Sequence, residues 1–176
     1  FLADCRRWYD SFCHAGAAPR LPGPGDMLLA AADAVIAAQN LVVAAHSLGL
    51  GSCYIGDILE QCETHRALLG LPPEVFPAAM VVLGWPTAQQ LARPKPARFD
   101  RKYLVFENRY RILSPQEHRA MHEERALGEG REGFDFEESI TRFCQRKDQS
   151  DFSREMTRSA REYLKGFPYD GESREE

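Results

Sequence analysis

The chain has 176 residues, of which 44% are hydrophobic and 27% are charged, and its formal net charge at pH 7 is -4. This length and composition predict one globular domain with a sizeable core, and the acidic balance argues against nucleic acid or an anionic membrane as the main partner. The five cysteines are odd in number and widely spaced. Neither a disulfide framework nor a zinc site is therefore expected, and a reducing, cytoplasmic setting is the simplest interpretation.

The first residues, Phe1-Leu2-Ala3-Asp4-Cys5, are typical of the tail of a buried strand. Because this strand would arrive without any preceding element, we expect that Phe1 is not the native start of the protein. An aromatic cluster follows, and then a loop rich in glycine and proline from Gly16 to Gly25. The cluster consists of Trp8, Tyr9 and Phe12.

A long apolar helix is predicted from about Met27 to Leu48, with Asp26 as its N-cap and Gly49 as its left-handed stop. Its apolar residues lie on every face, so it must be buried in a core, a membrane or an interface. The length would suffice for a membrane span, but the run is rich in alanine and carries Asp33 and Asn40 without basic flanks. Burial against a second copy of the chain is the favoured alternative.

Shorter elements are predicted after this helix. An amphipathic helix is expected over Asp57 to Leu69, and a short buried strand over Ala78 to Leu83. A loop rich in proline and cations spans Pro86 to Arg101, and the β-prone stretch from Lys102 to Phe106 is expected to be extended.

The C-terminal third is predicted to be helical. Ser114, Pro115 and Glu117 form the signature of a helix start, because the serine can cap, the proline fits the first turn and the glutamate can reach back. A break is expected near Gly128 to Gly133. A last helix is expected over Asp151 to Lys165, and the polar tail from Asp170 to Glu176 is expected to fray.

The most informative motif is the glycine turn, Ser47-Leu48-Gly49-Leu50-Gly51-Ser52-Cys53-Tyr54-Ile55-Gly56. Glycine has no side chain and accepts positive φ, so such a turn can bring the backbone close to a flat ligand. The residues alone leave a plainer alternative open, in which Gly49 and Gly51 only stop the helix and Tyr54 begins the next element.

A second motif is the cationic loop, Arg93-Pro94-Lys95-Pro96-Ala97-Arg98. Its prolines hold the chain extended and reduce the entropy lost when the cations are ordered. Arginine offers a planar fork to phosphate oxygens and lysine a compact charge. A solvated surface loop is the alternative.

Together with Gly84-Trp85-Pro86 and Glu107-Asn108-Arg109-Tyr110, these motifs make the chain resemble the nitroreductase family of flavoproteins, nearest its NADPH-dependent, oxygen-insensitive branch. The resemblance implies an α+β fold, with a small mixed or antiparallel sheet flanked by helices and a central helix buried in a homodimer. It also implies a nitroreductase-like core over 1–113, incomplete at its N-terminus, and a helical C-terminal extension of the same domain over 114–176. The family's Arg-Ser-x-Arg flavin motif has no counterpart in the sequence.

The resemblance further implies an FMN-dependent oxidoreductase. Such an enzyme passes hydride from NAD(P)H through flavin N5 to a nitroaromatic, quinone or flavin acceptor. The matching positions for the isoalloxazine edge are Tyr54, Ile55, Gly56 and Asp57, and those for the flavin phosphate are Lys95 and Arg98. No residue is assigned to a catalytic or metal-binding role, and the site is expected at the dimer interface. The alternative is a non-catalytic dimerisation or ligand-binding module that has lost its N-terminal flavin-binding segment.

Three further groups carry weaker signals. His118 and His122 have the spacing of a metal pair on a helix, but a surface position is favoured because no third ligand is in sight. Cys53 is expected to be a small buried residue and not a reactive thiol. A cationic stretch in the C-terminal third is where related NADPH-specific enzymes bind the 2′-phosphate, although a solvated helix face is the simpler interpretation. Its members are Arg142, Arg146, Lys147 and Arg154.

Overall fold

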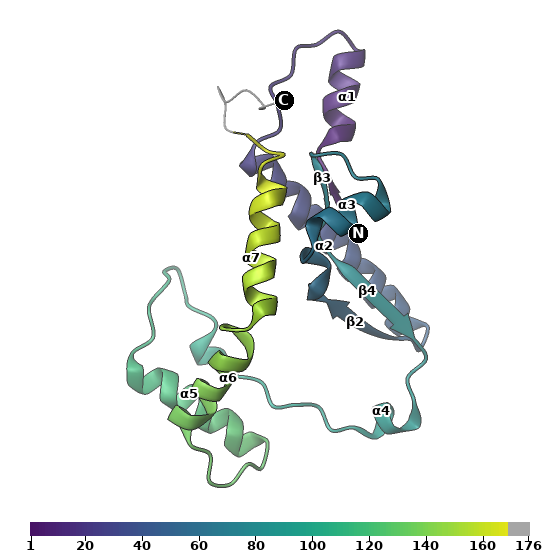
Figure 1. The fold of residues 1–176 in the computed structure, drawn as a ribbon. Coiled ribbons are helices and arrows are strands. Elements are labelled where there is room, and N and C mark those ends of the chain that lie inside the picture. The colour runs from purple at the N-terminus through teal and green to yellow at the C-terminus, as the bar shows by residue number, and fades with distance from the viewer. Residues whose placement is uncertain (169–176) are drawn as a thin grey trace. The chain divides into compact units, whose positions relative to one another are not determined.

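The computed structural model describes residues 1–168 (Figure 1). The predicted tail from Asp170 to Glu176 lies outside the described residues. The chain divides into two compact units: Phe1–Ala88 with the segment that begins at Asp151, and Gln89–Ser150. The division into a core over 1–113 and an extension over 114–176 stays a prediction.

The first unit begins with β1 (Leu2–Asp4), which pairs antiparallel with β3 (Val75–Pro77). The strand at the N-terminus was predicted, but β3 was not, because three residues are too few to show a period. Helix α1 (Arg6–His14) follows directly, since the Asp4 carboxylate accepts hydrogen bonds from the Arg6 and Arg7 backbone N–H groups. The sequence alone indicated only an aromatic cluster in this segment.

Helix α2 (Pro24–Ser47) is the long apolar helix that the sequence predicts. Its N-cap is Gly23, so the prediction of Asp26 as the N-cap was wrong. Asp26 occupies the third helical position, and its carboxylate accepts a hydrogen bond of 2.8 Å from the Gly23 N–H. In a capping box the glutamate at this third position accepts the same hydrogen bond from the N-cap backbone N–H. At the other end Gly49 has φ +80°, which confirms the left-handed stop.

Most of the apolar surface of α2 is open in the described chain. Only three small residues, Ala34, Ala38 and Ala45, are buried, whereas Leu28 is 71% exposed and Leu29 69%. An 18-residue stretch of this helix has a mean hydropathy of 1.8, and 11% of that stretch is buried. By length and composition the helix could therefore cross a membrane. Helices of soluble cores satisfy the same criteria. The helix therefore needs a cover that the described residues do not provide.

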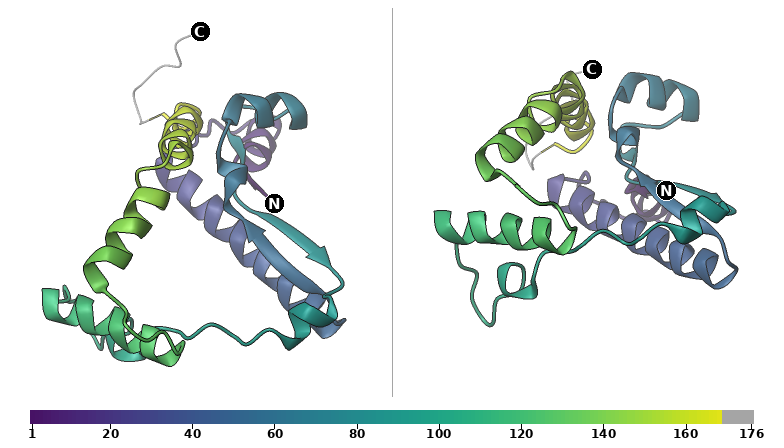
Figure 2. Two further views of the ribbon diagram at one scale, coloured as in Figure 1. Left: turned by 60° about the horizontal axis from the view of Figure 1, so that its bottom comes forward. Right: turned by 90° about the horizontal axis from the view of Figure 1, so that it is seen from below.

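A two-stranded antiparallel ribbon of β2 (Gly51–Ile55) and β4 (Met80–Gly84) lies along α2 in both views of Figure 2. Its register pairs Gly51 with Gly84 and Ile55 with Met80. Strand β4 confirms the strand predicted over Ala78 to Leu83, although it begins at Met80 and includes Gly84. The expectation that it is buried was wrong for the chain by itself, because Val82 is 53% exposed.

The predicted helix over 57–69 is divided in the structure. It consists of the 3-10 helix η1 (Gly56–Leu59) and helix α3 (Cys62–Leu69). The break lies at Gln61, whose φ of 47° is left-handed and cannot continue a helix. Helix α7 (Asp151–Leu164) confirms the predicted last helix and packs against α3 and η1.

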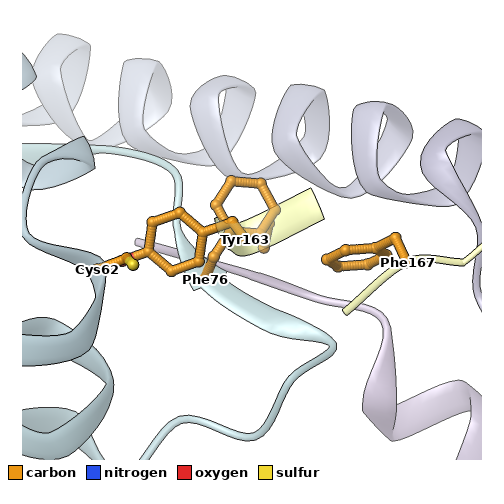
Figure 3. Close-up of a cluster of buried hydrophobic side chains, with 5 residues drawn as sticks. Cys62, Phe76, Tyr163 and Phe167 are labelled. Carbon is orange, nitrogen blue, oxygen red and sulfur yellow. The ribbon is translucent and has the colours of Figure 1, made fainter. Parts of the chain in front are cut away.

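The core of the first unit lies where β1, β3, α3 and the end of α7 meet (Figure 3). Phe76 stands with its ring centroid 5.6 Å from that of Tyr163 and 6.2 Å from that of Phe167. Cys62 is fully buried, and its backbone N–H donates a hydrogen bond of 3.1 Å to Ser159 Oγ. These contacts fix α3, and hence the turn before it, against α7.

An arginine at the surface reinforces this junction. Arg158 of α7 contacts Glu63 of α3 at 2.7 Å and Glu155 of its own helix at 2.7 Å. Its hydrogen bonds lower the pKa of both carboxyls from an ordinary 4.5 to about 2.

This junction gives a prediction for the pH dependence of stability. Since both carboxyls bind protons less readily in the folded chain, their contribution is complete above about pH 4.5 and is lost as the pH falls towards 2. We expect Arg158→Met to flatten the fall of the melting temperature over this interval, which thermal denaturation at a series of pH values measures. The matched control is Arg161→Met on the same helix, and an equal flattening by both variants would contradict the assignment.

The second unit contains η2 (Arg101–Tyr103), α5 (Pro115–Gly128) and α6 (Phe136–Lys147), and the short helix α4 (Ala88–Ala92) leads into it. The capping box of Ser114 and Glu117 is present as predicted. The extended stretch predicted over 102–106 was wrong. There the Asp100 carboxylate accepts a hydrogen bond from the Lys102 N–H and starts a 3-10 turn, and Tyr103 is buried with its hydroxyl 2.9 Å from Glu124 Oε1.

Candidate functional site

The glycine turn joins the end of α2 to the ribbon. Gly49 is the helix stop, and a Cβ at this position would lie 3.6 Å from the Trp85 ring, so backbone and indole are in close contact. Gly51 already belongs to β2. Cys53 is exposed, which contradicts its predicted burial; its neighbours on the ribbon give it no apolar cover within the described chain.

Tyr54, Ile55, Gly56 and Asp57 run from the last residues of β2 into η1. The Tyr54 hydroxyl donates a hydrogen bond of 3.3 Å to Gln39 Oε1, which holds the ring against α2. Gly56 and Asp57 are exposed. They form the first turn of η1, and no described side chain caps it.

The backbone at Gly56 is unobstructed. A Cβ placed on it would meet nothing within 4 Å, and its φ is not in the left-handed region. The first N–H groups of a helical turn have no partner inside the turn. A flat molecule with an acceptor on its edge could therefore approach this backbone closely and take a hydrogen bond from it.

The cationic loop lies in the second unit. Lys95 and Arg98 are both exposed, and within residues 1–168 neither forms an ion pair. Between them Ala97 is half-buried, and its Cβ lies 3.3 Å from where a Cβ on Gly128 would stand. Ala97 thus packs against the end of α5. Because Tyr54–Asp57 belong to the first unit, the joining of the two groups into one site is a proposal.

The remaining candidates are engaged in local contacts. His118 is exposed, while His122 is half-buried between the rings of Phe99 at 5.1 Å and Phe136 at 5.6 Å. Burial, followed by the charge of Arg125, lowers the pKa of His122. In the described part of the chain no group of three or more His, Cys, Asp or Glu residues is placed to hold a metal ion.

Of the C-terminal cations, Arg142 pairs with Glu138, and Arg154 lies 3.5 Å from Asp151. Arg146 stacks over the Phe143 ring at 5.7 Å. These contacts suit a solvated helix face.

Sequence reasoning missed one concave site. A cavity of about 500 Å³ opens between α1, the loop that follows it and the first half of α2. The aromatic cluster of Trp8, Tyr9 and Phe12 was the only signal for it, because the opposite wall comes from residues up to 25 positions later in the chain.

Comparison with known proteins finds similarity to one family. Residues 14–85, which contain α2 and the glycine turn, match the model of the nitroreductase family. The oxygen-insensitive NADPH nitroreductase of Salmonella typhimurium is 40% identical over 67 residues, which make up 38% of this chain and 27% of that protein. The matched stretch thus spans about a quarter of the curated relative.

Solved structures agree on the fold. The NfrA1 nitroreductase of B. subtilis superposes with a TM-score of 0.67 at 25% identity, over 95% of this chain and 68% of that one. NfrA1 of B. megaterium gives a TM-score of 0.73 at 25% identity, with the same coverage of 95% and 68%. The predicted α+β nitroreductase-like fold is therefore confirmed.

Proposed function

Proceeding from the nitroreductase family, which the comparisons support for this chain, we propose that the protein is an FMN-dependent oxidoreductase with NAD(P)H as co-substrate. Its acceptor is a nitroaromatic, a quinone or a free flavin. The observation that carries the proposal is the bare, uncapped backbone at Gly56, inside the segment that matches the family. When bound, FMN supplies the hydride transfer between donor and acceptor.

The residues around the turn fit one edge of a flavin ring. Tyr54, Ile55, Gly56 and Asp57 offer main-chain groups with no Cβ in the way at Gly56. A fixed N–H donor at the ring's acceptor edge tunes the electronics of the ring and sets the ring's position. Asp57 takes part through its backbone, so its side chain need not contact the ring.

The phosphate of FMN is assigned to Lys95 and Arg98. Both cations are exposed, and no described carboxylate neutralises either one, so their charges are available to an anion. The prolines on both sides of Lys95 limit the freedom that the loop loses when it closes on a phosphate.

The cover that α2 needs is assigned to a second copy of the chain. Leu28 and Ile36 on the helix, Val82 on the ribbon and Trp85 just after it are exposed, and exposed apolar surface of this kind is typical of an interface. A lipid cover is disfavoured because the β2–β4 ribbon packs along α2, and open sheet edges are not tolerated in hydrocarbon. We assign the protein to the cytoplasm, where its five free cysteines would stay reduced.

Gly56→Val tests the flavin assignment. We expect FMN affinity to fall by about ten- to hundredfold, because the branched side chain occupies the space that the ring needs. Flavin absorbance that remains with the protein after gel filtration measures it. The fold should persist, since nothing lies within 4 Å of the new Cβ. Gly25→Val is the matched control, because a Cβ on Gly25 also meets nothing within 4 Å.

The first outcome to read is the colour of the purified protein. Yellow protein with oxidised-flavin absorbance bands supports the enzyme. Colourless protein that stays colourless with added FMN supports the non-catalytic module. Normal flavin loading of Gly56→Val would show that the glycine turn is only structural.

A further inference from the structure

The cavity beside α1 has the form of a small-molecule site and contains none of the residues Tyr54–Asp57. Its volume of about 500 Å³ lies within the range of about 300–1,000 Å³ typical of ligand pockets. One wall is aromatic: Trp8 and Phe12 stand one helical turn apart with ring centroids 5.7 Å apart, and Tyr9 lies beside them. Leu29 and Ala30 of α2 form the apolar wall across from it.

The charges on the walls are mostly negative. Asp26 is neutralised by Arg20, at 2.6 Å and 3.0 Å, and Asp4 lies 3.1 Å from Arg7. Asp33, one helical turn beyond Leu29, forms no ion pair within the described residues. One carboxylate therefore remains open beside an aromatic wall.

The thiol of Cys5 also lines the cavity, and its pKa is shifted by the same negative charges. Burial raises its pKa, and the charges of Asp26, Asp4 and Glu74 raise it further. The thiol thus stays protonated near neutral pH and does not compete with Asp33 as a charged group. Negative potential with aromatic faces is the combination that binds organic cations.

We infer that this cavity is a second ligand site, which takes a small organic monocation with an aromatic or apolar body. The body lies between the wall of Trp8 and Phe12 and the wall of Leu29, and the positive charge is held by Asp33 and the faces of the rings. The inference makes no use of flavin, so it stands or falls separately from the proposed function.

The test uses benzyltrimethylammonium as the probe, titrated into the full chain by isothermal calorimetry. Benzyl alcohol and benzoate, of similar shape but neutral and negative, are the comparison probes. We expect saturable binding of the cation, weaker binding of the alcohol and none of benzoate. Asp33→Asn should weaken binding of the cation by about fivefold and leave the alcohol unchanged, and Trp8→Ala should weaken both probes. Glu60→Gln, a carboxylate outside the cavity lining, is the control.

A second readout comes from fluorescence. The chain has two tryptophans, so Trp85→Phe leaves Trp8 as the only tryptophan, and the probe should quench the tryptophan emission with the same affinity. Equal binding of benzoate and the cation, or an Asp33→Asn variant that binds the cation as the parent does, would overturn the inference. So would a Trp8 emission that changes with protein concentration before any probe is added, because a second copy would then cover the cavity.

Discussion

The double variant Lys95→Ala, Arg98→Ala is expected to bind FMN with a dissociation constant at least about a hundredfold higher than that of the parent. A hydrogen bond to a charged group contributes about 1.5–3 kcal/mol, and two of them to one phosphate are removed together. The two cations lie in the second unit and are not part of its core. Their removal should therefore leave folding unchanged and weaken only the binding of the phosphate. Fluorescence titration of FMN measures the effect.

A charge-matched control separates phosphate binding from net charge. Arg7→Ala with Lys165→Ala also removes two exposed cations, each of which sits in a local ion pair, with Asp4 and with Glu162. This control should keep its FMN affinity. A second distinction uses riboflavin, which lacks the phosphate: its affinity should be the same in the parent and in Lys95→Ala, Arg98→Ala. If FMN occupancy survives in the double variant, the phosphate belongs to other residues, of which Arg93 and Arg101 are the nearest in sequence.

The elements that the sequence predicted correctly are those whose signals are local. The capping box at Ser114 and the stop at Gly49 each depend on the chemistry of a few neighbouring residues. The elements it missed are set by their partners. Strand β2 pairs with β4 across about 25 residues of chain, and the stretch after Asp100 turns because Tyr103 finds a buried place beside Glu124. Propensity alone had favoured a strand there.

In the candidate sites, too, the parts with local sequence signals could be predicted and the parts built from distant residues could not. The main-chain character of the Gly56 turn could be predicted, because glycine spacing and helix ends are visible in a sequence. The cavity of Trp8 and Asp33 could not be predicted, because its walls belong to two helices joined by an irregular loop. The long apolar helix shows a third case. Its composition predicts burial, but within the described residues only Ala34, Ala38 and Ala45 of this helix are buried. The second copy that we propose as its cover is not visible in the sequence of one chain.

Gly166→Ala is expected to destabilise the first unit by about 3 kcal/mol or more. A Cβ on Gly166 would lie 2.0 Å from the carbonyl oxygen of Pro73 and 2.7 Å from its carbonyl carbon. Both are backbone atoms, so no side-chain rotation relieves the overlap, and the segment just after α7 must move away from the loop before β3. Phe167 would then leave its place against Phe76, and loss of a buried phenylalanine contact costs about 3–5 kcal/mol.

Urea denaturation followed by tryptophan fluorescence and circular dichroism measures this change. Gly25→Ala is the matched control, because its Cβ meets nothing within 4 Å in the first turn of α2; alanine there should be neutral or stabilise by up to about 1 kcal/mol. If the two variants unfold at the same urea concentration, the segment just after α7 does not pack tightly on Pro73. The placement of α3 and of the Gly56 turn, which depend on α7, would then need revision. Confirmation would show that one residue without a side chain, 110 positions after Gly56, stabilises the unit that carries the proposed flavin-binding backbone.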